Sequence, residues 1–144
     1  MSKNKSDSFN ELLKLSAKFL EEAEKNAELN PASNEIQVVI VEPMKKPYAK
    51  IIPNTLDAMR DIVGGYIEVV RAGRSKTGKE FIITVNEEGK LMGLTPNRMI
   101  VNFDLLVGTF FISAANLKGD NVTLSDEEAQ DFIMKFTALE VELK

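Results

Sequence analysis

A run of apolar, mostly β-branched residues, Ile36-Gln-Val-Val-Ile-Val-Glu42, constrains the fold of this 144-residue chain more than any other feature. Such a run is typical of a buried strand, and Pro43 directly after it marks where the strand ends. A second strand at Tyr48–Ile52 can return beside the first. The first half of the chain therefore begins with a pair of strands.

A short helix is expected after this pair. Asn54 is placed to cap it, and its apolar residues fall on one face of a helix over 55–63. Gly64 and Gly65 provide the left-handed exit that commonly ends a helix. The order up to residue 65 is thus strand, strand, helix.

Beyond residue 65 the apolar residues recur with a period of two, which predicts strands. Three short strands joined by a loop and a turn form the expected meander. The strands are Tyr66–Ala72, Phe81–Val85 and Lys90–Leu94, the loop is 73–79, and the turn is Asn86–Gly89 with a left-handed Gly89.

The last third of the chain predicts one more strand and one more helix. A polar loop at Thr95–Arg98 comes first, followed by a long strand at Phe103–Ala115 that Gly108 interrupts. Ser125 to Glu128 then form a capping box that opens a helix. The expected fold class is α+β, with a mixed, mostly antiparallel sheet of about six short strands and two core helices, in a single domain over 36–144.

An amphipathic helix is expected before this domain, within residues 1–29. Ser8 and Glu11 are spaced as a capping box, and apolar residues then recur at steps of three and four as far as Ala27. The apolar stripe is broader than a coiled-coil seam, so we expect the helix to pack on something: the domain, a second copy in a homo-oligomer, or another protein. Residues 30–35, which include Pro31, predict a linker.

Composition excludes several classes of function. The chain has no cysteine and no histidine, which removes disulfides, thiolate zinc sites and the usual general base, so we expect no metal, no cofactor and no enzyme activity. A net charge of −4 is too small to favour a nucleic-acid partner. The N-terminus has no apolar segment typical of a signal peptide, and the apolar run at 105–115 is too short for a membrane span.

Four short motifs in order carry a family resemblance. They are Val63-Gly-Gly-Tyr-Ile-Glu-Val-Val70, Asn86-Glu-Glu-Gly-Lys-Leu91, Gly93-Leu-Thr-Pro-Asn-Arg98 and Leu106-Val-Gly-Thr-Phe-Phe111. Together they resemble the domain-of-unknown-function family numbered 3846, small proteins of phages, prophages and mobile elements of bacteria. The resemblance covers about residues 36–133 and leaves the first helix outside. It implies a protein made in the cytoplasm of a bacterial host, and it supplies no active-site residues.

The loop at 73–79 is the main candidate for contact with an anionic ligand or partner. Arg71, Arg74, Lys76 and Lys79 concentrate positive charge there. The spacing of Gly73, Gly78 and Lys79 matches a phosphate-binding loop, but Glu80 stands where Ser or Thr should follow, and a strand pattern comes next instead of a helix. Two interpretations stay open: a solvated hairpin loop, and a cationic contact surface.

Three further residues are candidates for ligand contact. Tyr66 beside two glycines could stack on a base, and Asn97 with Arg98 on the predicted loop could bind an amide edge and a phosphate. These residues suggest two functions. The first is an accessory protein that binds a host protein and inhibits a host defence or other host process, and the alternative is a module that sequesters a small anionic ligand such as a nucleotide.

Overall fold

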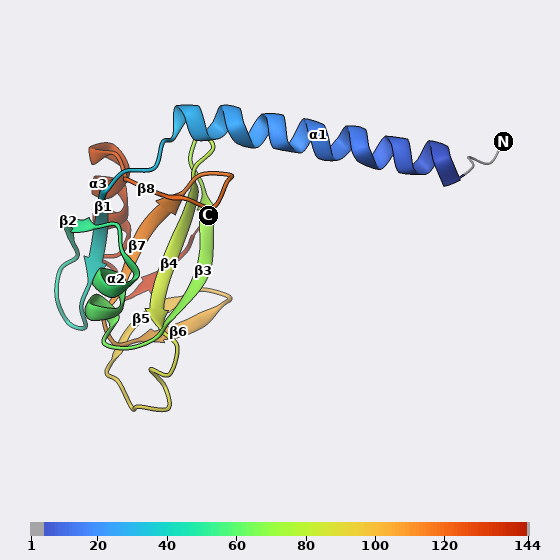
Figure 1. Cartoon of the computed structure of the whole chain (residues 1–144). Coiled ribbons are helices and arrows are strands. Elements are labelled where there is room, and N and C mark those ends of the chain that lie inside the picture. The colour runs from blue at the N-terminus through green and yellow to red at the C-terminus, as the bar shows by residue number, and fades with distance from the viewer. Residues whose placement is uncertain (1–4, 144) are drawn as a thin grey trace.

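A computed structural model of the chain describes residues 5–143, with side chains from residue 8 onward (Figure 1). One long helix extends away from a body that contains every other element. The elements in chain order are α1 (Lys5–Leu29), β1 (Glu35–Val41), β2 (Tyr48–Pro53), α2 (Leu56–Val63), β3 (Ile67–Arg74), β4 (Glu80–Asn86), β5 (Pro96–Ile100), β6 (Asp104–Val107), β7 (Phe110–Ala115), β8 (Asn121–Val122), α3 (Asp126–Lys135) and β9 (Glu140–Val141).

The body is built on two sheets. The larger one is antiparallel, with strand order β2-β1-β7-β4-β3 and with β8 paired to β7. The smaller one has the order β6-β5-β9, in which β9 runs parallel to β5. The α+β class and the mostly antiparallel six-stranded sheet are as expected from the sequence, whereas the second sheet was not predicted.

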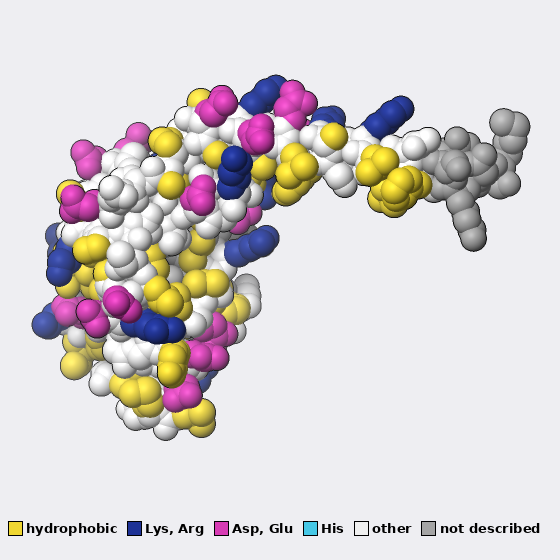
Figure 2. All heavy atoms as spheres, viewed as in Figure 1, with side chains coloured by type: hydrophobic (Ala, Val, Ile, Leu, Met, Phe, Trp, Pro, Cys, Tyr) yellow, Lys and Arg dark blue, Asp and Glu magenta, His cyan; other side chains and the backbone are white. Residues whose placement is uncertain are grey.

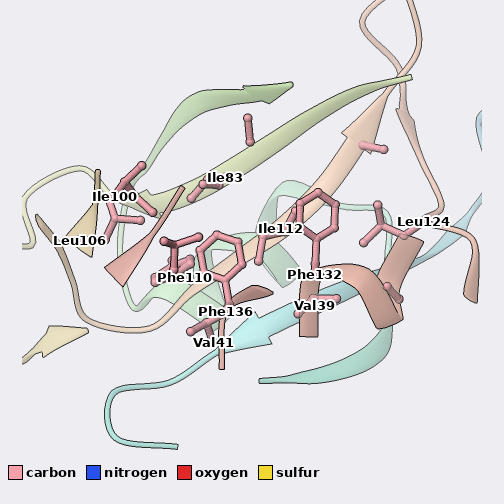
Figure 3. Close-up of a cluster of buried hydrophobic side chains, with 14 of the residues drawn as sticks. Val39, Val41, Ile83, Ile100, Leu106, Phe110, Ile112, Leu124, Phe132 and Phe136 are labelled. Atoms are coloured by element: carbon pink, nitrogen blue, oxygen red, sulfur yellow. The ribbon is translucent and has the colours of Figure 1, made fainter. Parts of the chain in front are cut away.

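The buried strand predicted at 36–42 is confirmed as β1, which is covered on both faces. Alternate residues of β1 enter two hydrophobic clusters, one against α2 with Met59 and Val63, and the other against α3 with Phe132 and Phe136. Figure 3 shows the second cluster, where the Phe136 ring lies edge-on to Phe110 with 5.7 Å between centroids. Burial on both faces explains why the strand is almost entirely apolar.

The meander predicted over 66–94 is wrong in its third strand. β3 and β4 pair as expected, but residues 90–93 form turns and residue 94 is irregular. The reason is that β4 lies between β3 and β7, so it has no free edge for a further strand. Gly89 was expected in a left-handed conformation, but its φ is not positive.

The region 95–115 also differs from the prediction. Of Thr95–Arg98, expected as a loop, residues 96–98 belong to β5, and the long strand expected at 103–115 is divided into β6 and β7. Gly108 has a φ of 72°, and this left-handed residue turns the chain from the small sheet into the large one. The interruption was expected at Gly108, but the change of sheet was not.

Two of the three predicted helix caps are wrong. α1 begins at Lys5, so Ser8 lies inside the helix instead of capping it. The cap of α2 is Thr55, whose side chain accepts from the amide of Ala58, whereas Asn54 lies one residue earlier and donates its side-chain amide to the carbonyl of Ser33. The capping box at Ser125 and the left-handed exit at Gly64 are confirmed.

Candidate functional site

The apolar face of α1 is exposed to solvent over most of its length. Six large side chains on this helix remain between 53% and 65% exposed: Phe9, Leu12, Leu13, Leu15, Phe19 and Leu20. Figure 2 shows hydrophobic side chains gathered along the lower side of the extended helix. The helix has 25 residues and therefore reaches about 37 Å. We call the six side chains the α1 stripe.

Near its C-terminal end the same helix face meets the rest of the protein. Residues 9, 13, 16, 20, 23 and 27 follow one another at alternating steps of four and three, so they share one side of the helix. Ala23 on this side is 4% exposed and Asn26 is 9% exposed. The protein thus covers the last part of the apolar face and leaves the α1 stripe uncovered.

Three buried asparagines fix the base of α1, and we call Asn26, Asn30 and Asn116 the asparagine cluster. The side-chain amide of Asn26 donates to the carbonyl of Gly78 at 3.0 Å, and that of Asn30 donates to the carbonyl of Thr77 at 3.1 Å. Asn116 donates to the carbonyl of Asn30 at 3.0 Å. Because these bonds come from separate parts of the chain, they hold the helix in one direction relative to the body.

The loop at 73–79, predicted as the anionic-contact candidate, is largely occupied by contacts within the protein. Its carbonyls at 77 and 78 receive the asparagine bonds. Arg74 pairs with Glu80 at 3.2 Å, and Lys79 pairs with Glu128 at 2.8 Å with its side chain only 13% exposed. Among the residues that the structure describes, Arg71 and Lys76 are the basic residues of this set without an ion pair. The loop joins antiparallel strands, and no helix follows it directly.

The ion pair of Lys79 belongs to the start of α3. Glu128 accepts from Lys79 and also from the backbone amide of Ser125 at 2.8 Å, while the Ser125 hydroxyl accepts from the amide of Glu128. Burial of the Glu128 carboxylate would raise its pKa, but the hydrogen bonds from Lys79 and Ser125 outweigh burial and bring the pKa below its ordinary value. Lys79 therefore stabilises the fold and is not free to bind an external anion.

Asn97 and Arg98, expected on an exposed polar loop, are buried instead. Arg98 is 3% exposed and its guanidinium donates to the carbonyls of Phe136 at 2.8 Å, Lys45 at 2.9 Å and Asn97 at 3.2 Å. The Asn97 side chain donates to the carbonyls of Val41 and Gly108. Burial lowers the pKa of the Arg98 guanidinium. Both side chains join parts of the fold and do not reach the surface where a ligand would bind.

Tyr66 is exposed but lies apart from the basic loop. It directly precedes β3, whereas Arg74 is the last residue of the same eight-residue strand, which spans about 26 Å. The side chain of Arg60 lies over the Tyr66 ring at 5.0 Å from its centroid. The structure therefore does not bring Tyr66, Arg98 and the basic loop together in one site.

A hollow of about 780 Å³ lies beside β3 and the C-terminal segment. Residues from β3, from the turn between β5 and β6, and from the C-terminal segment border it: Val70, Arg71, Ile100, Val101, Asn102, Phe103, Glu142 and Leu143. Arg71 is exposed here, and Phe103 is 58% exposed. Of the predicted site residues, Arg71 borders this hollow, whereas Tyr66 borders a separate one of about 410 Å³ and Arg74 another of about 290 Å³.

No three acidic side chains described in the structure lie close enough together to hold a metal ion. None of the described helices combines the length and apolar character that crossing a bilayer requires.

The asparagine cluster was missed at the sequence level. The sequence contains a partial signal for Asn26 and Asn30. These two polar residues, four positions apart, lie on the helix face that is otherwise apolar. Asn116 has no such signal, since its partner Asn30 is 86 residues away. The hollow beside Arg71 also has no local pattern, because three separate segments form its walls.

These features define an α+β protein with an extended helix that is hydrogen-bonded to the body at its base and carries an exposed apolar surface. Residues 36–137 match the family model described as domain of unknown function (DUF3846), and the chain belongs to this family. The matched range includes all buried residues of the cluster against α2 and all of the cluster against α3 except Val141, and it excludes α1. Comparisons with curated proteins and with solved structures gave no match.

Proposed function

We propose that the protein acts by binding another protein and that the α1 stripe is its contact surface. The observation that supports this is the combination of six exposed apolar side chains with a helix base fixed by buried hydrogen bonds. Removing apolar surface from water contributes about 25 cal/mol of favourable free energy for each Å². Contiguous exposed apolar patches therefore mark interaction sites. A helix already ordered and oriented also loses less entropy on binding than a disordered segment.

The setting of this binding activity comes from the family resemblance. We propose an accessory protein of a phage or mobile element that works in the bacterial cytoplasm and inhibits a host defence or another host process by occupying a host protein. Family membership over 36–137 and a surface suited to protein contact support this proposal. Accessory proteins that act in this way need no catalytic group.

Affinity capture from bacterial cells with matched variants tests the proposal. Leu13→Glu with Leu20→Glu places two carboxylates within the α1 stripe, and Leu29→Glu makes the same change on an exposed leucine of α1 that lies off the stripe. All three positions are exposed, so we expect the variants to fold with stability changes of about 0.5 kcal/mol or less. The parent and Leu29→Glu should capture a protein that the double variant does not capture. A second copy of the chain counts as such a protein. If no associated protein depends on the stripe, this proposal is wrong.

A second candidate function is the sequestration of a small anionic ligand, and the hollow beside Arg71 favours it. Arg71 has no ion pair among the described residues, and an exposed phenylalanine borders the same hollow. A guanidinium next to an aromatic ring can bind a phosphate and a flat base together. In a thermal-shift screen of nucleotides, a ligand of this hollow should raise Tm in the parent and in Lys76→Gln but not in Arg71→Gln. A panel without any Arg71-dependent shift would exclude it.

A further inference from the structure

We infer that the α1 stripe is covered by the same stripe of a second copy of the chain, with the two helices antiparallel. This inference rests on the proposed function, because it names the partner of the same surface. Its grounds are the position of the body relative to the stripe, the distribution of charge along α1, the fit between the residues of two stripes, and the area that pairing would bury.

The position of the body excludes a parallel pair. The buried Ala23 and Asn26 continue the helix face that carries the stripe, so the body lies on the stripe side at the C-terminal end of α1. Two parallel helices packed through their stripes would bring both bodies to the same end and into the same space. In the antiparallel arrangement the bodies lie at opposite ends, and each stripe stays open to the other.

Charge along α1 also favours the antiparallel arrangement. Residues 8–18 carry one acidic and two basic side chains, whereas residues 19–29 carry four acidic and one basic. A parallel pair would place the acidic halves side by side, which is unfavourable. An antiparallel pair places each acidic half beside the basic half of the other copy, and complementary charge of this kind selects orientation.

The stripe is complementary to itself when it is reversed. With the two-fold axis between residues 14 and 15, Phe9 faces Leu20 of the second copy, and Leu13 faces Ser16 of the second copy. Leu12 of each copy then lies beside Phe19 of the other copy along one side of the pair. Each leucine at 13 thus meets a small serine, and alternation of large and small side chains allows close helix packing at distances of 8–10 Å. A two-fold pair of this kind is the commonest form of homodimer.

The area to be buried is enough for a dimer of modest affinity. Two phenylalanines and four leucines, each more than half exposed, would remove on the order of 600 Å² per copy from water. Two copies together would then bury roughly 1,200 Å², at the lower end of the range for specific interfaces. We therefore expect a dimer that dissociates on dilution in the micromolar range.

Sedimentation of the full chain at increasing concentration measures this dimer. The parent and Leu29→Glu should approach twice the 16.0 kDa of one chain between about 1 and 100 μM. Leu13→Glu with Leu20→Glu should raise the dissociation constant at least about 100-fold, because the carboxylates would be buried without partners. A parent that stays monomeric, or a dimer that the stripe variant leaves unchanged, would overturn the inference.

Orientation is measured by cross-linking, which is simple here because the chain has no cysteine. Asn10 and Ala17 are exposed residues beside the stripe that lie near each other across an antiparallel pair. A mixture of Asn10→Cys and Ala17→Cys chains should form a mixed disulfide faster than either chain forms one with itself. A mixed disulfide that forms no faster than either self-disulfide would contradict the antiparallel pair.

The two experiments separate this inference from the proposed function. A monomeric parent that still captures a different protein through the stripe refutes the homodimer and leaves the proposed function intact. A chain that neither dimerises nor captures any protein through the stripe refutes both.

Discussion

The side-chain amide of Asn26 donates to the carbonyl of Gly78 at 3.0 Å, and this contact joins the base of α1 to the loop between β3 and β4. The two residues are 52 positions apart. The side-chain oxygen of Asn26 accepts from the backbone amide of Leu117 at 2.9 Å, so this one side chain connects the helix to two loops. The direction in which the α1 stripe extends therefore depends on the close approach of these segments.

The first prediction tests this close approach. Gly78 has a φ of 88°, and a Cβ there would lie 2.6 Å from the Asn26 amide nitrogen. Gly119 is a matched control, because its φ is 86° and a Cβ there would have no neighbour within 4 Å. Gly119→Ala should cost about 1–2 kcal/mol for the left-handed conformation alone, and Gly78→Ala about 1 kcal/mol more for the disturbed hydrogen bond.

Chemical denaturation of the two variants gives these costs. In an Asn26→Ala background the additional cost at Gly78 should disappear, since the group that the new methyl would meet is gone. Equal costs for Gly78→Ala and Gly119→Ala in the parent would mean that the contact with Asn26 contributes nothing measurable.

The second prediction concerns the part of the chain that folds alone. A chain that begins at Asn34 should unfold cooperatively, because both hydrophobic clusters are formed by residues from 36 onward. It should be less stable than the full chain by about 2–4 kcal/mol, since Asn116 and the carbonyls of Thr77 and Gly78 lose their partners on α1. Urea unfolding followed by circular dichroism measures both properties. A truncated chain without a cooperative transition would show that α1 is required for the core.

The third prediction concerns the buried Arg98. Arg98→Lys keeps the charge but cannot reach carbonyls at 136, 45 and 97 with one ammonium group, so at least one buried carbonyl loses its partner. We expect a loss of about 3 kcal/mol in the free energy of unfolding. Arg71→Lys on exposed β3 is the control and should change stability by about 0.5 kcal/mol or less. Similar values for the two variants would mean that the guanidinium contacts are dispensable.

How much the sequence predicts depends on whether the cause is local. The β-branched run of β1 and the capping box at Ser125 depend on neighbouring residues, and both are confirmed. Gly108 was identified as an interruption from its type alone, because a glycine inside a strand pattern is a local signal. The assignment of 90–94 to a strand failed because it depended on which edge of β4 is free, which only the sheet order decides.

The candidate site was harder to predict for the same reason. Arg98 was expected at the surface, as most arginines are, but its acceptors are backbone carbonyls that any residue can supply, so they leave no pattern in the sequence. Lys79 was identified by its charge, but its partner Glu128 is 49 residues away. The amphipathic pattern of α1 was visible, whereas the asparagine cluster that decides how much of its apolar face stays exposed was not.

The last prediction concerns acid unfolding through Lys79 and Glu128. The Glu128 pKa is below its ordinary value in the folded protein, so folding favours the ionised carboxylate. Its contribution is complete above the unfolded pKa of about 4.3 and is lost as the pH falls through the lower folded pKa. Glu128→Gln should therefore cost about 1–2 kcal/mol near pH 7, through loss of the ion pair and weakening of the capping box, and its deficit should shrink toward pH 3.

Glu127→Gln, an exposed change in the same turn, controls for the loss of charge at the start of α3. Urea unfolding at a series of pH values measures the difference, and a deficit of Glu128→Gln that stays constant from about pH 7 to about pH 3 would contradict the assignment of this carboxylate as a stabilising ion.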